Sequence, residues 1–344
     1  MDYANIKYNF IIGHGRGGTT LLLYILNAHP QIYGLPEFKN ILITKNSKNI
    51  NTFKSITKRY FTHLEKKSFL NKIPESLKGN KADFDLLNST FDKNLSLREK
   101  YIRIAISINK VFDPPNRDKS IITHIVHKIP YYTFFVKELI QIFPESKFII
   151  NIRDPRAQNY SHIKRHSTEK VFLGKSHPEG RQTLWNFYAK ETIELLQKYP
   201  ERCYLFQYEK FVENPEKIMR EILQFLDVPY SEKIWDYHLY VKEFLNKAQP
   251  YLSENKIKKY IPLSKPVSTE YKEDWKKMNP KDIEVIEYIC KSYMQKLGYN
   301  PIHQNPQIPI SSKIKILFYQ LWYWLVIKSH IAKYVHKIYQ QYFF

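Results

Sequence analysis

Residues 9–20 read NFIIGHGRGGTT, and this stretch decides the fold. It consists of an apolar run from Phe10 to Ile12, a loop with four glycines, and a second apolar run from Leu21 to Leu26. That order predicts a strand, a tight turn and a helix. Glycines let the backbone approach an anion closely, and the amide groups at the start of a helix point toward it. We therefore predict a phosphate cradle formed by His14, Gly15, Arg16, Gly17, Gly18, Thr19 and Thr20.

Two known phosphate-binding patterns fit this loop in part. Gly13, Gly15 and Gly18 satisfy the dinucleotide-binding pattern G-x-G-x-x-G. The nucleotide-triphosphate loop G-x-x-x-x-G-K-[ST] fits less well, because Thr19 stands where the lysine belongs. The cation here is Arg16, inside the loop, which favours a ligand whose transferred group needs charge from that side. A glycine-rich turn without a ligand is the simpler alternative.

Length and composition indicate the size of the domain and the charge of its binding partners. The 344 residues, 43% of them hydrophobic, can bury the core of one large α/β domain. Lys and Arg number 54 against 33 Asp and Glu, which gives a formal charge of +21. This charge indicates an anionic partner, whether a nucleotide, an acidic substrate, anionic lipid or nucleic acid.

Cysteine usage and the first residues suggest a compartment. Cys203 and Cys290 are too few for a disulfide framework and too far apart for a metal-site spacing, which favours a reducing interior. The opening Met1-Asp2-Tyr3 does not begin a signal peptide, so a cytoplasmic protein is expected. No cluster of Asp, Glu and His has metal-ligand spacing, and we therefore expect no metal requirement.

Strand-like and helix-like segments alternate in the second half of the chain. Strands are predicted at 121–128, 147–152 and 203–208, and helices at 130–143, from Pro155 onward, at about 181–199 and from 215 to about 226. Asn214-Pro215 is typical of a helix cap followed by its first residue. This alternation predicts an α/β fold with a mostly parallel central sheet between two layers of helices.

Two segments stand outside this pattern. Residues 41–120 are polar and rich in Lys and Asn, and we expect a helical insertion there, within a main domain of residues 1–305. Residues 306–344 are basic and aromatic, and we expect them to form a C-terminal helical appendage.

A second group of cations follows the strand at 147–152. The stretch from Arg153 to His166 reads RDPRAQNYSHIKRH and places Arg153 at the carboxyl end of that strand, where α/β sheets bind ligands. Ser161 and Arg165 are four residues apart and share one helical face. We predict a second anion site here. The alternative is a salt-bridged surface helix in which Asp154 pairs with a neighbouring arginine.

These segments resemble the sulfotransferases that use 3′-phosphoadenosine-5′-phosphosulfate (PAPS), nearest to the tyrosylprotein sulfotransferase branch and its microbial relatives. The first loop of that family has the form R-S-G-T-T and holds the 5′-phosphosulfate; here it runs from Arg16 to Thr20, with Gly17 in place of serine. Ala28-His29-Pro30 and then Glu37 follow at the family's spacing. The resemblance covers most of residues 8–38 and 124–230, more weakly 260–301, and implies a P-loop-like three-layer fold.

The resemblance also assigns nucleotide contacts in the second half of the chain. Arg153 and Ser161 have the spacing of the family's 3′-phosphate site, and Arg165 matches a further basic position. Tyr208 belongs to a stretch that resembles the family's nucleotide-contacting element. Lys265 lies in the segment that corresponds to the family's loop over the nucleotide.

The implied reaction moves a sulfuryl group from PAPS to an acceptor hydroxyl, in a carbohydrate, a glycolipid or a tyrosyl peptide, and leaves adenosine 3′,5′-bisphosphate (PAP). Glu37 is the candidate general base, since the hydroxyl proton must leave as the O–S bond forms. Lys128 falls where the family has an active-site lysine. Arg16 and Lys128 are expected to stabilise the charge that develops on the leaving phosphate.

Two other classes of function remain open. A P-loop kinase or other nucleotide-dependent phosphotransferase would use the same cradle, although Thr19 in the lysine position counts against it. A non-enzymatic protein that binds an anionic surface would use the charge of +21, but it leaves the spacing of Arg16, Glu37, Lys128 and Arg153 unexplained. We therefore expect no nucleic-acid partner.

The C-terminal segment suggests a further partner. Lys313 to Phe344 contains five lysines, ten aromatic residues and no acid, and its uncharged core from Ile316 to Ile327 is shorter than the roughly twenty residues of a bilayer span. From Ser329 to Gln341 the polar residues fall on one face of a helix. We expect residues 313–344 either to lie on an anionic membrane surface, which makes the protein peripheral, or to pack on the enzyme body or in a homodimer.

Overall fold

The structure is a computed structural model, and it describes residues 3–35, 37, 94–107, 114, 117–166, 177–248 and 254–328. Most of the predicted insertion at 41–120 and the predicted amphipathic stretch at 329–341 lie outside these ranges. Within the insertion, the described part contains α5 (Leu97–Ser107) and a short 3-10 turn at Lys119–Ile121.

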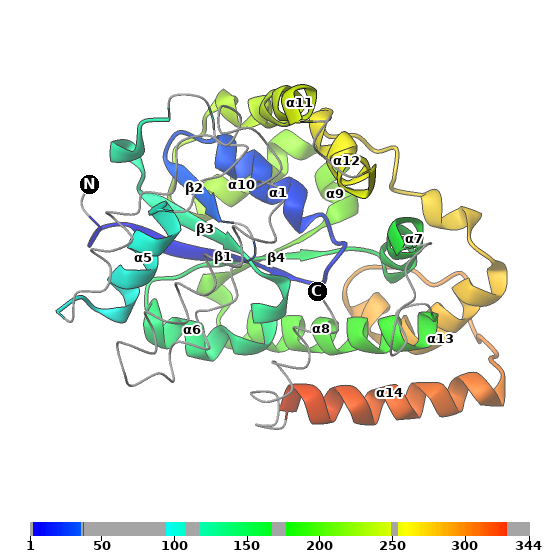
Figure 1. Cartoon of the computed structure of the whole chain (residues 1–344). Coiled ribbons are helices and arrows are strands. Elements are labelled where there is room, and N and C mark those ends of the chain that lie inside the picture. Colours follow the sequence, from blue (N-terminus) through cyan, green and yellow to red (C-terminus); the bar gives the residue numbers. More distant parts are fainter. Residues whose placement is uncertain are drawn as a thin grey trace.

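The centre of the fold is a parallel sheet of five strands in the order β2-β3-β1-β4-β5 (Figure 1). The strands are β1 (Lys7–Gly13), β2 (Ile32–Leu35), β3 (His124–Lys128), β4 (Phe148–Ile152) and β5 (Cys203–Gln207). The predicted parallel sheet and its strands near 121–128, 147–152 and 203–208 are confirmed. β3 is shorter than predicted because Lys119–Ile121 forms a 3-10 turn ahead of it.

Apolar side chains on both faces of the strands explain why helices cover the sheet twice. In β1, Tyr8, Phe10 and Ile12 point into one core, and Ile11 points into the other. The first core contains side chains of α5, α6 (Val136–Ile142) and α8 (Pro178–Lys198). The second core contains side chains of α1 (Thr19–Ala28), α9 (Tyr208–Glu213) and α10 (Pro215–Phe225).

The predicted helices appear with small differences. The segment 130–143 divides into a 3-10 helix, η4 (Pro130–Phe135), and α6. Pro155 begins α7 (Pro155–His166), as expected. Asn214 occupies the N-cap position of α10, and its carbonyl oxygen accepts from the Ile218 amide at 3.2 Å, but within the described residues its side chain makes no capping hydrogen bond.

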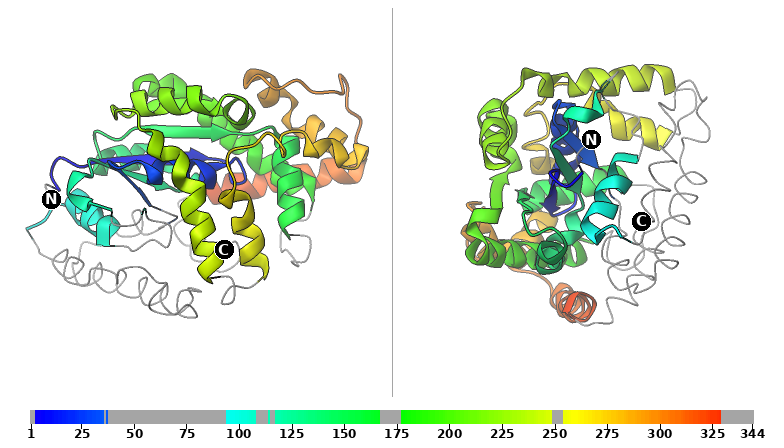
Figure 2. Two further views of the ribbon diagram at one scale, coloured as in Figure 1. Left: turned by 90° about the horizontal axis from the view of Figure 1, so that it is seen from above. Right: turned by 90° about the vertical axis from the view of Figure 1, so that its left-hand side faces the viewer.

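Within the described residues from 237 to 328, four α-helices follow. They are α11 (Tyr237–Ala248), α12 (Glu254–Tyr260), α13 (Pro280–Lys296) and α14 (Ile310–Lys328). α13 packs on α7 and α8 around a third apolar cluster that contains Trp185, Trp275 and Ile286. α14 packs on α8 and forms the outermost layer on that side of the sheet (Figures 1 and 2). No helix within the described ranges combines the length and hydropathy needed to cross a bilayer.

The direction in which the chain builds the sheet changes beside β1. From β1 the chain first builds the β2-β3 side of the sheet and then crosses to build the β4-β5 side. At the carboxyl edge of the sheet, the connection after β1 therefore leads toward β2, and the connection after β4 leads the other way, toward β5. Parallel α/β sheets bind their ligands at such a point.

Candidate functional site

The principal predicted site residues come together along the carboxyl edge of the sheet. Glu37 follows β2, Lys128 ends β3, the loop at 14–18 follows β1, Arg153 follows β4 and Tyr208 follows β5. Because the strands are parallel and ordered β2-β3-β1-β4-β5, these residues lie across the edge in that same order. Every strand of the sheet thus supplies one part of the candidate site.

The loop between β1 and α1 requires glycine at both of its ends. Gly13 and Gly18 have φ of 113° and 91°, in the region that favours glycine. A Cβ on Gly13 would lie 2.3 Å from the carbonyl oxygen of Asn151, so the loop is pressed against the end of β4. Gly18 is the N-cap of α1, and no side chain of the described residues caps this helix. A helix start without a side-chain cap is the kind of place where an anion can bind, and the anion site at this loop stays a prediction.

Arg16 links the loop to the second predicted anion site. Its Nη2 donates a hydrogen bond to Ser161 Oγ on α7, at 3.0 Å. Arg16 itself has φ of 68°, a left-handed conformation that costs a non-glycine residue about 1–2 kcal/mol. Strained conformations of this kind occur at ligand sites, where the surrounding structure holds them.

Arg153 and Tyr208 form the other wall of the site. The Arg153 guanidinium lies 4.3 Å from the centroid of the Tyr208 ring, and the Arg153 residue is 6% exposed. Arg153 Nη2 donates to the carbonyl oxygen of Tyr271 at 2.8 Å. The Tyr208 ring packs against Gly18, where an added Cβ would lie 2.6 Å from Tyr208 Cδ2. Burial raises the pKa of Tyr208 although Arg153 opposes the shift, so its hydroxyl stays protonated at neutral pH.

Glu37 and Lys128 form an ion pair at the other end of the site. Lys128 Nζ lies 2.5 Å from Glu37 Oε1, and the two side chains are 9% and 32% exposed. Lys128 is registered beside Ile11 of β1, two residues before Gly13, so it lies at the base of the loop. A carboxylate is a group that can accept the proton of a hydroxyl. The carboxylate is also the more accessible of the two groups.

His14 is a buried residue of the loop that contacts the loop backbone. Its Nδ1 lies 2.7 Å from the carbonyl oxygen of Gly15, and Gln158 Nε2 lies 3.0 Å from the same ring nitrogen. Burial lowers the pKa of His14 to about 4, while the contact with Gly15 opposes the shift. His14 is therefore neutral at physiological pH, and it positions the loop without adding charge to it.

The remaining predicted residues fall into three groups. Gly15, Gly17, Thr19 and Thr20 lie in the cradle or the first turn of α1. Arg165 lies in α7, but the structure does not describe its side chain. Lys265 is exposed, its carbonyl oxygen accepts a hydrogen bond from Tyr237 at 2.8 Å, and within the described ranges its side chain has no hydrogen bond or ion pair to the cradle.

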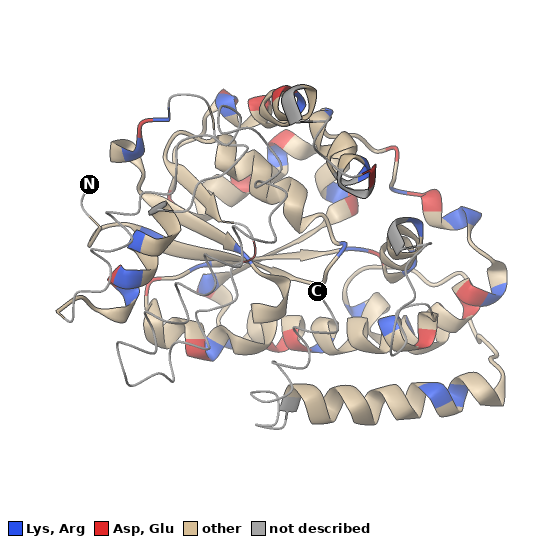
Figure 3. Ribbon diagram, viewed as in Figure 1, with Lys and Arg blue, Asp and Glu red and all other residues tan. Residues whose placement is uncertain are grey.

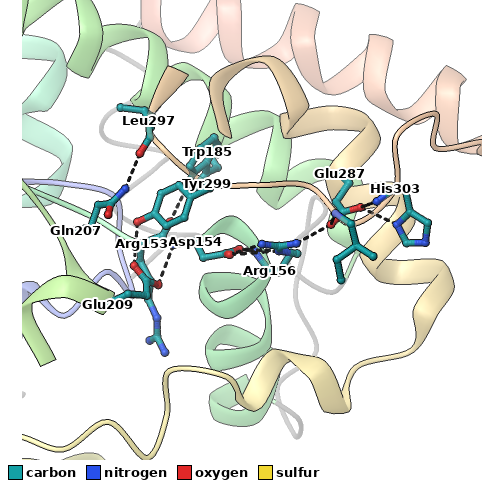
Figure 4. A network of polar contacts seen from close by, with 11 residues as sticks. Arg153, Asp154, Arg156, Trp185, Gln207, Glu209, Glu287, Leu297, Tyr299 and His303 are labelled. Atoms are coloured by element: carbon teal, nitrogen blue, oxygen red, sulfur yellow. Dashed lines mark hydrogen bonds and ion pairs between the residues drawn. The ribbon is translucent and has the colours of Figure 1, made fainter. Parts of the chain in front are cut away.

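A polar network that the sequence analysis missed fixes the backbone around Arg153 (Figure 4). Glu209 accepts hydrogen bonds from the Asp154 amide at 3.1 Å and from the Tyr299 hydroxyl at 2.9 Å. Trp185 Nε1 donates to the Arg153 carbonyl oxygen at 3.2 Å. Burial raises the pKa of Glu209 above its ordinary value. Helices α8 and α9 and the segment after α13 thus hold the start of α7 in place.

The same network decides which arginine pairs with Asp154. Arg156 Nη2 lies 2.6 Å from Asp154 Oδ2, and Arg156 Nη1 lies 2.7 Å from the buried Glu287. The Arg153 guanidinium points away from the Asp154 carboxylate (Figure 4). The salt-bridged alternative therefore holds for Arg156, while Arg153 faces the cradle. Glu287 is 131 residues away in sequence, and no local pattern marks it as a partner.

One groove lies apart from this site. This groove of about 680 Å³ runs along the edge strand β5, between α8, α10 and the end of α13, and contains none of the predicted site residues. In the part of the chain that the structure describes, no three His, Cys, Asp or Glu side chains are grouped so that they could hold a metal ion.

Comparison with known proteins gives one family. The model of the family described as "Sulfotransferase family" matches residues 9–232. The chain is 30% identical over 184 residues to protein-tyrosine sulfotransferase 1 of Danio rerio, covering 53% of this chain and 50% of the relative. It is 28% identical over 304 residues to the protein-tyrosine sulfotransferase of Drosophila melanogaster, covering 86% and 52%. The chain thus spans about half the length of the curated relatives it matches.

Solved structures show the same fold. The sulfotransferase domain from the curacin biosynthetic pathway matches with a TM-score of 0.54 and 18% identity, covering 86% of this chain and 98% of that domain. The sulfotransferase domain of the Synechococcus PCC 7002 olefin synthase matches with a TM-score of 0.52 and 17% identity, covering 86% and 96%. At these identities the likeness concerns the fold alone, and it agrees with the predicted P-loop-like three-layer architecture.

Proposed function

The chain belongs to the sulfotransferase family, and from that premise we propose that it transfers the sulfuryl group of PAPS to an acceptor hydroxyl and releases PAP. The observation that carries this proposal is the order of groups along the sheet edge. A carboxylate–lysine pair lies at one end, the anion loop in the middle, and a stacked arginine at the other end. One bis-phosphorylated nucleotide bound along this edge would meet all three.

The donor side follows from the fit of the cradle. The first amides of α1 and the Arg16 guanidinium would hold the 5′-phosphosulfate. Arg153 and Ser161 would hold the 3′-phosphate, since the Arg153 fork suits an anion and its face already lies on Tyr208. The close contact between Gly18 and Tyr208 brings these two ends of the cradle together.

The acceptor side gives the residues their roles in the reaction. The acceptor oxygen forms a bond to sulfur as the bond from sulfur to the bridging phosphate oxygen breaks, and the electron pair of that bond stays on the phosphate. The acceptor proton passes to the Glu37 carboxylate. Lys128 and Arg16 stabilise the negative charge that grows on the leaving phosphate. Lys128 also pairs with Glu37 and so orients the carboxylate of the base.

A row of aromatic rings packs beside the loop. The row consists of His14, Tyr188, Phe134 and Tyr131, with neighbouring ring centroids 4.8, 4.6 and 5.9 Å apart. The Gly13 amide donates to Thr133 Oγ1 at 2.9 Å and so ties η4, which carries two of the rings, to the base of the loop. The names of the curated relatives support a tyrosyl peptide as the acceptor ahead of a carbohydrate or a glycolipid.

Donor competition tests the proposal. The full chain would be incubated with radiolabelled PAPS or radiolabelled ATP and with tyrosyl peptides, glycans and glycolipids as acceptors. We expect label from PAPS on one acceptor class, together with PAP release, and no transfer from ATP. Transfer of the ATP γ-phosphate would favour the phosphotransferase alternative. Tight PAP binding without transfer to any hydroxyl would contradict the catalytic assignment.

A further inference from the structure

α14 is apolar on two opposite faces. One face packs on α8 through buried side chains, among them Ile316, Tyr319, Tyr323 and Val326. Ser312 Oγ donates to Glu179 of α8 at 2.9 Å and fixes the start of the contact. Residues 310–328 are therefore part of the folded body, while the predicted amphipathic stretch at 329–341 lies outside the described residues.

The opposite face of α14 carries large apolar side chains that are open to solvent. Seven of them have exposed fractions between 39% and 75%, and they recur at helical spacing along the outer side: Ile310, Ile314, Leu317, Phe318, Leu321, Trp324 and Leu325. We refer to these seven residues as the exposed stripe. A helix with two opposite apolar faces normally has both faces covered. The exposed stripe therefore indicates a binding partner.

The charged residues of α14 itself are all lysines. α14 contains Lys313, Lys315 and Lys328 and no acid, and Figure 3 shows no acidic position along it. Lys315 pairs with Glu179 of α8 at 3.6 Å, and Lys313 Nζ lies 6.0 Å from the centroid of the Tyr288 ring of α13. The chain continues with Lys333 and Lys337, again without an acid as far as Phe344. A partner for this surface therefore has to be apolar and anionic together.

We propose that the exposed stripe binds the surface of an anionic lipid bilayer, with α14 lying in the plane of the interface. An apolar face on a helix that carries lysines and no acid, with Trp324 and Phe318 within that face, suits the boundary between acyl chains and headgroups. α14 has 19 residues, of which three are lysines, so this helix lies on the bilayer and does not cross it. α8 holds the helix at the outer edge of the body, where it projects beyond the other described helices (Figure 2).

A second copy of the chain fits the exposed stripe less well. In a symmetric pair, each α14 would meet the same helix of the other copy, so lysines would face lysines. Neither helix has a carboxylate to offset that repulsion. Anionic headgroups supply the opposite charge without this conflict.

Vesicle flotation of the full chain tests the proposal. Vesicles of phosphatidylcholine alone would be compared with vesicles that also contain phosphatidylglycerol, at low and high salt. The test variant is L317E/L321E, at two exposed positions of the stripe, and the matched control is Leu239→Glu, an exposed leucine of α11. Far-ultraviolet circular dichroism and the PAP-induced thermal shift verify that both variants fold.

We expect the wild-type chain and the control to float with the anionic vesicles, and high salt to weaken that binding. The affinity of the stripe variant for the vesicles should fall by about tenfold or more, since each Glu replaces apolar burial with the desolvation of a charge. Trp324 should move to an apolar environment, so a blue shift of tryptophan fluorescence on binding should be lost in Trp324→Phe. Equal flotation of the stripe variant and the control would overturn the proposal. The proposal would also be overturned if light scattering showed a dimer for the wild type and a monomer for L317E/L321E, and if the wild type did not float with the vesicles.

Discussion

Arg16 Nη2 donates a hydrogen bond to Ser161 Oγ at 3.0 Å, and this contact joins the loop after β1 to the helix after β4. The two anion sites expected from the sequence are therefore adjacent parts of one cradle, with Arg16 between them. A ligand that occupies both parts has to share this arginine. The arrangement suits a nucleotide with phosphates at both ends better than two independent anions.

Replacement of Glu37 by glutamine should separate binding from transfer. Glu37→Gln keeps the size of the side chain and deletes the proton acceptor, so we expect turnover to fall about a hundred- to ten-thousand-fold. The dissociation constant for PAP should stay within about threefold, because the cradle lies at Arg16 and Arg153. Steady-state transfer assays and calorimetric titration measure the two quantities.

An exposed glutamate of α8 provides the control for that variant. Glu194 pairs with Lys190 on the surface, and Glu194→Gln should change neither quantity. Undiminished turnover in Glu37→Gln would remove this residue from the role of general base.

Two glycines of the loop should respond differently to alanine. A Cβ at Gly18 would meet the Tyr208 ring at 2.6 Å, and the φ of 91° adds strain, so Gly18→Ala should lower the free energy of unfolding by about 1–3 kcal/mol. A Cβ at Gly15 would meet nothing within 4 Å, so Gly15→Ala should leave that free energy unchanged within about 0.5 kcal/mol. Urea unfolding compares the two. Equal destabilisation would mean that the loop does not have the conformation described above.

Local patterns account for what could be predicted from the sequence. The strand–loop–helix at 9–26 and the strands β3, β4 and β5 follow from apolar runs bounded by Gly, Pro or polar residues. β2 was not predicted, because it has only four residues and Gly34 lies in the middle of it. That strand nevertheless positions Glu37 at the sheet edge.

Contacts between distant residues account for what could not be predicted. Glu37 and Lys128 were each singled out, but their ion pair joins residues 91 apart and becomes visible only in the fold. The hydrogen bond between Tyr299 and Glu209 spans 90 residues and has no local signature. Arg153 and Arg156 look alike in sequence, and only the position of Glu287 in α13 decides which of them is used in a buried ion pair.

Two buried histidines should make the fold sensitive to mild acid. Burial lowers the pKa of His14 and of His124 to about 4, from about 6.5 in the unfolded chain. The unfolded chain therefore binds more protons between these values, so stability is complete above about pH 6.5 and falls as the pH decreases toward 4. Between pH 7.5 and 5.0 we expect a loss of about 2 kcal/mol for each histidine.

Urea unfolding at the two pH values measures this loss. His124 lies in β3, away from the cradle, so His124→Asn should remove its share of the pH dependence without altering the loop. An unchanged pH dependence in this variant would show that His124 is protonated in the folded state at pH 5.0.

The most direct test of the central claim is calorimetric titration of wild type and Arg153→Ala with PAP and with adenosine 5′-phosphate, which lacks the 3′-phosphate. If one cradle grips both ends of the nucleotide, the variant should bind PAP about tenfold or more weakly, because a charge-assisted contact is lost. Its affinity for adenosine 5′-phosphate should equal that of the wild type. Equal weakening for both ligands, or no weakening for PAP, would contradict the assignment of Arg153 to the 3′-phosphate and with it the two-ended cradle.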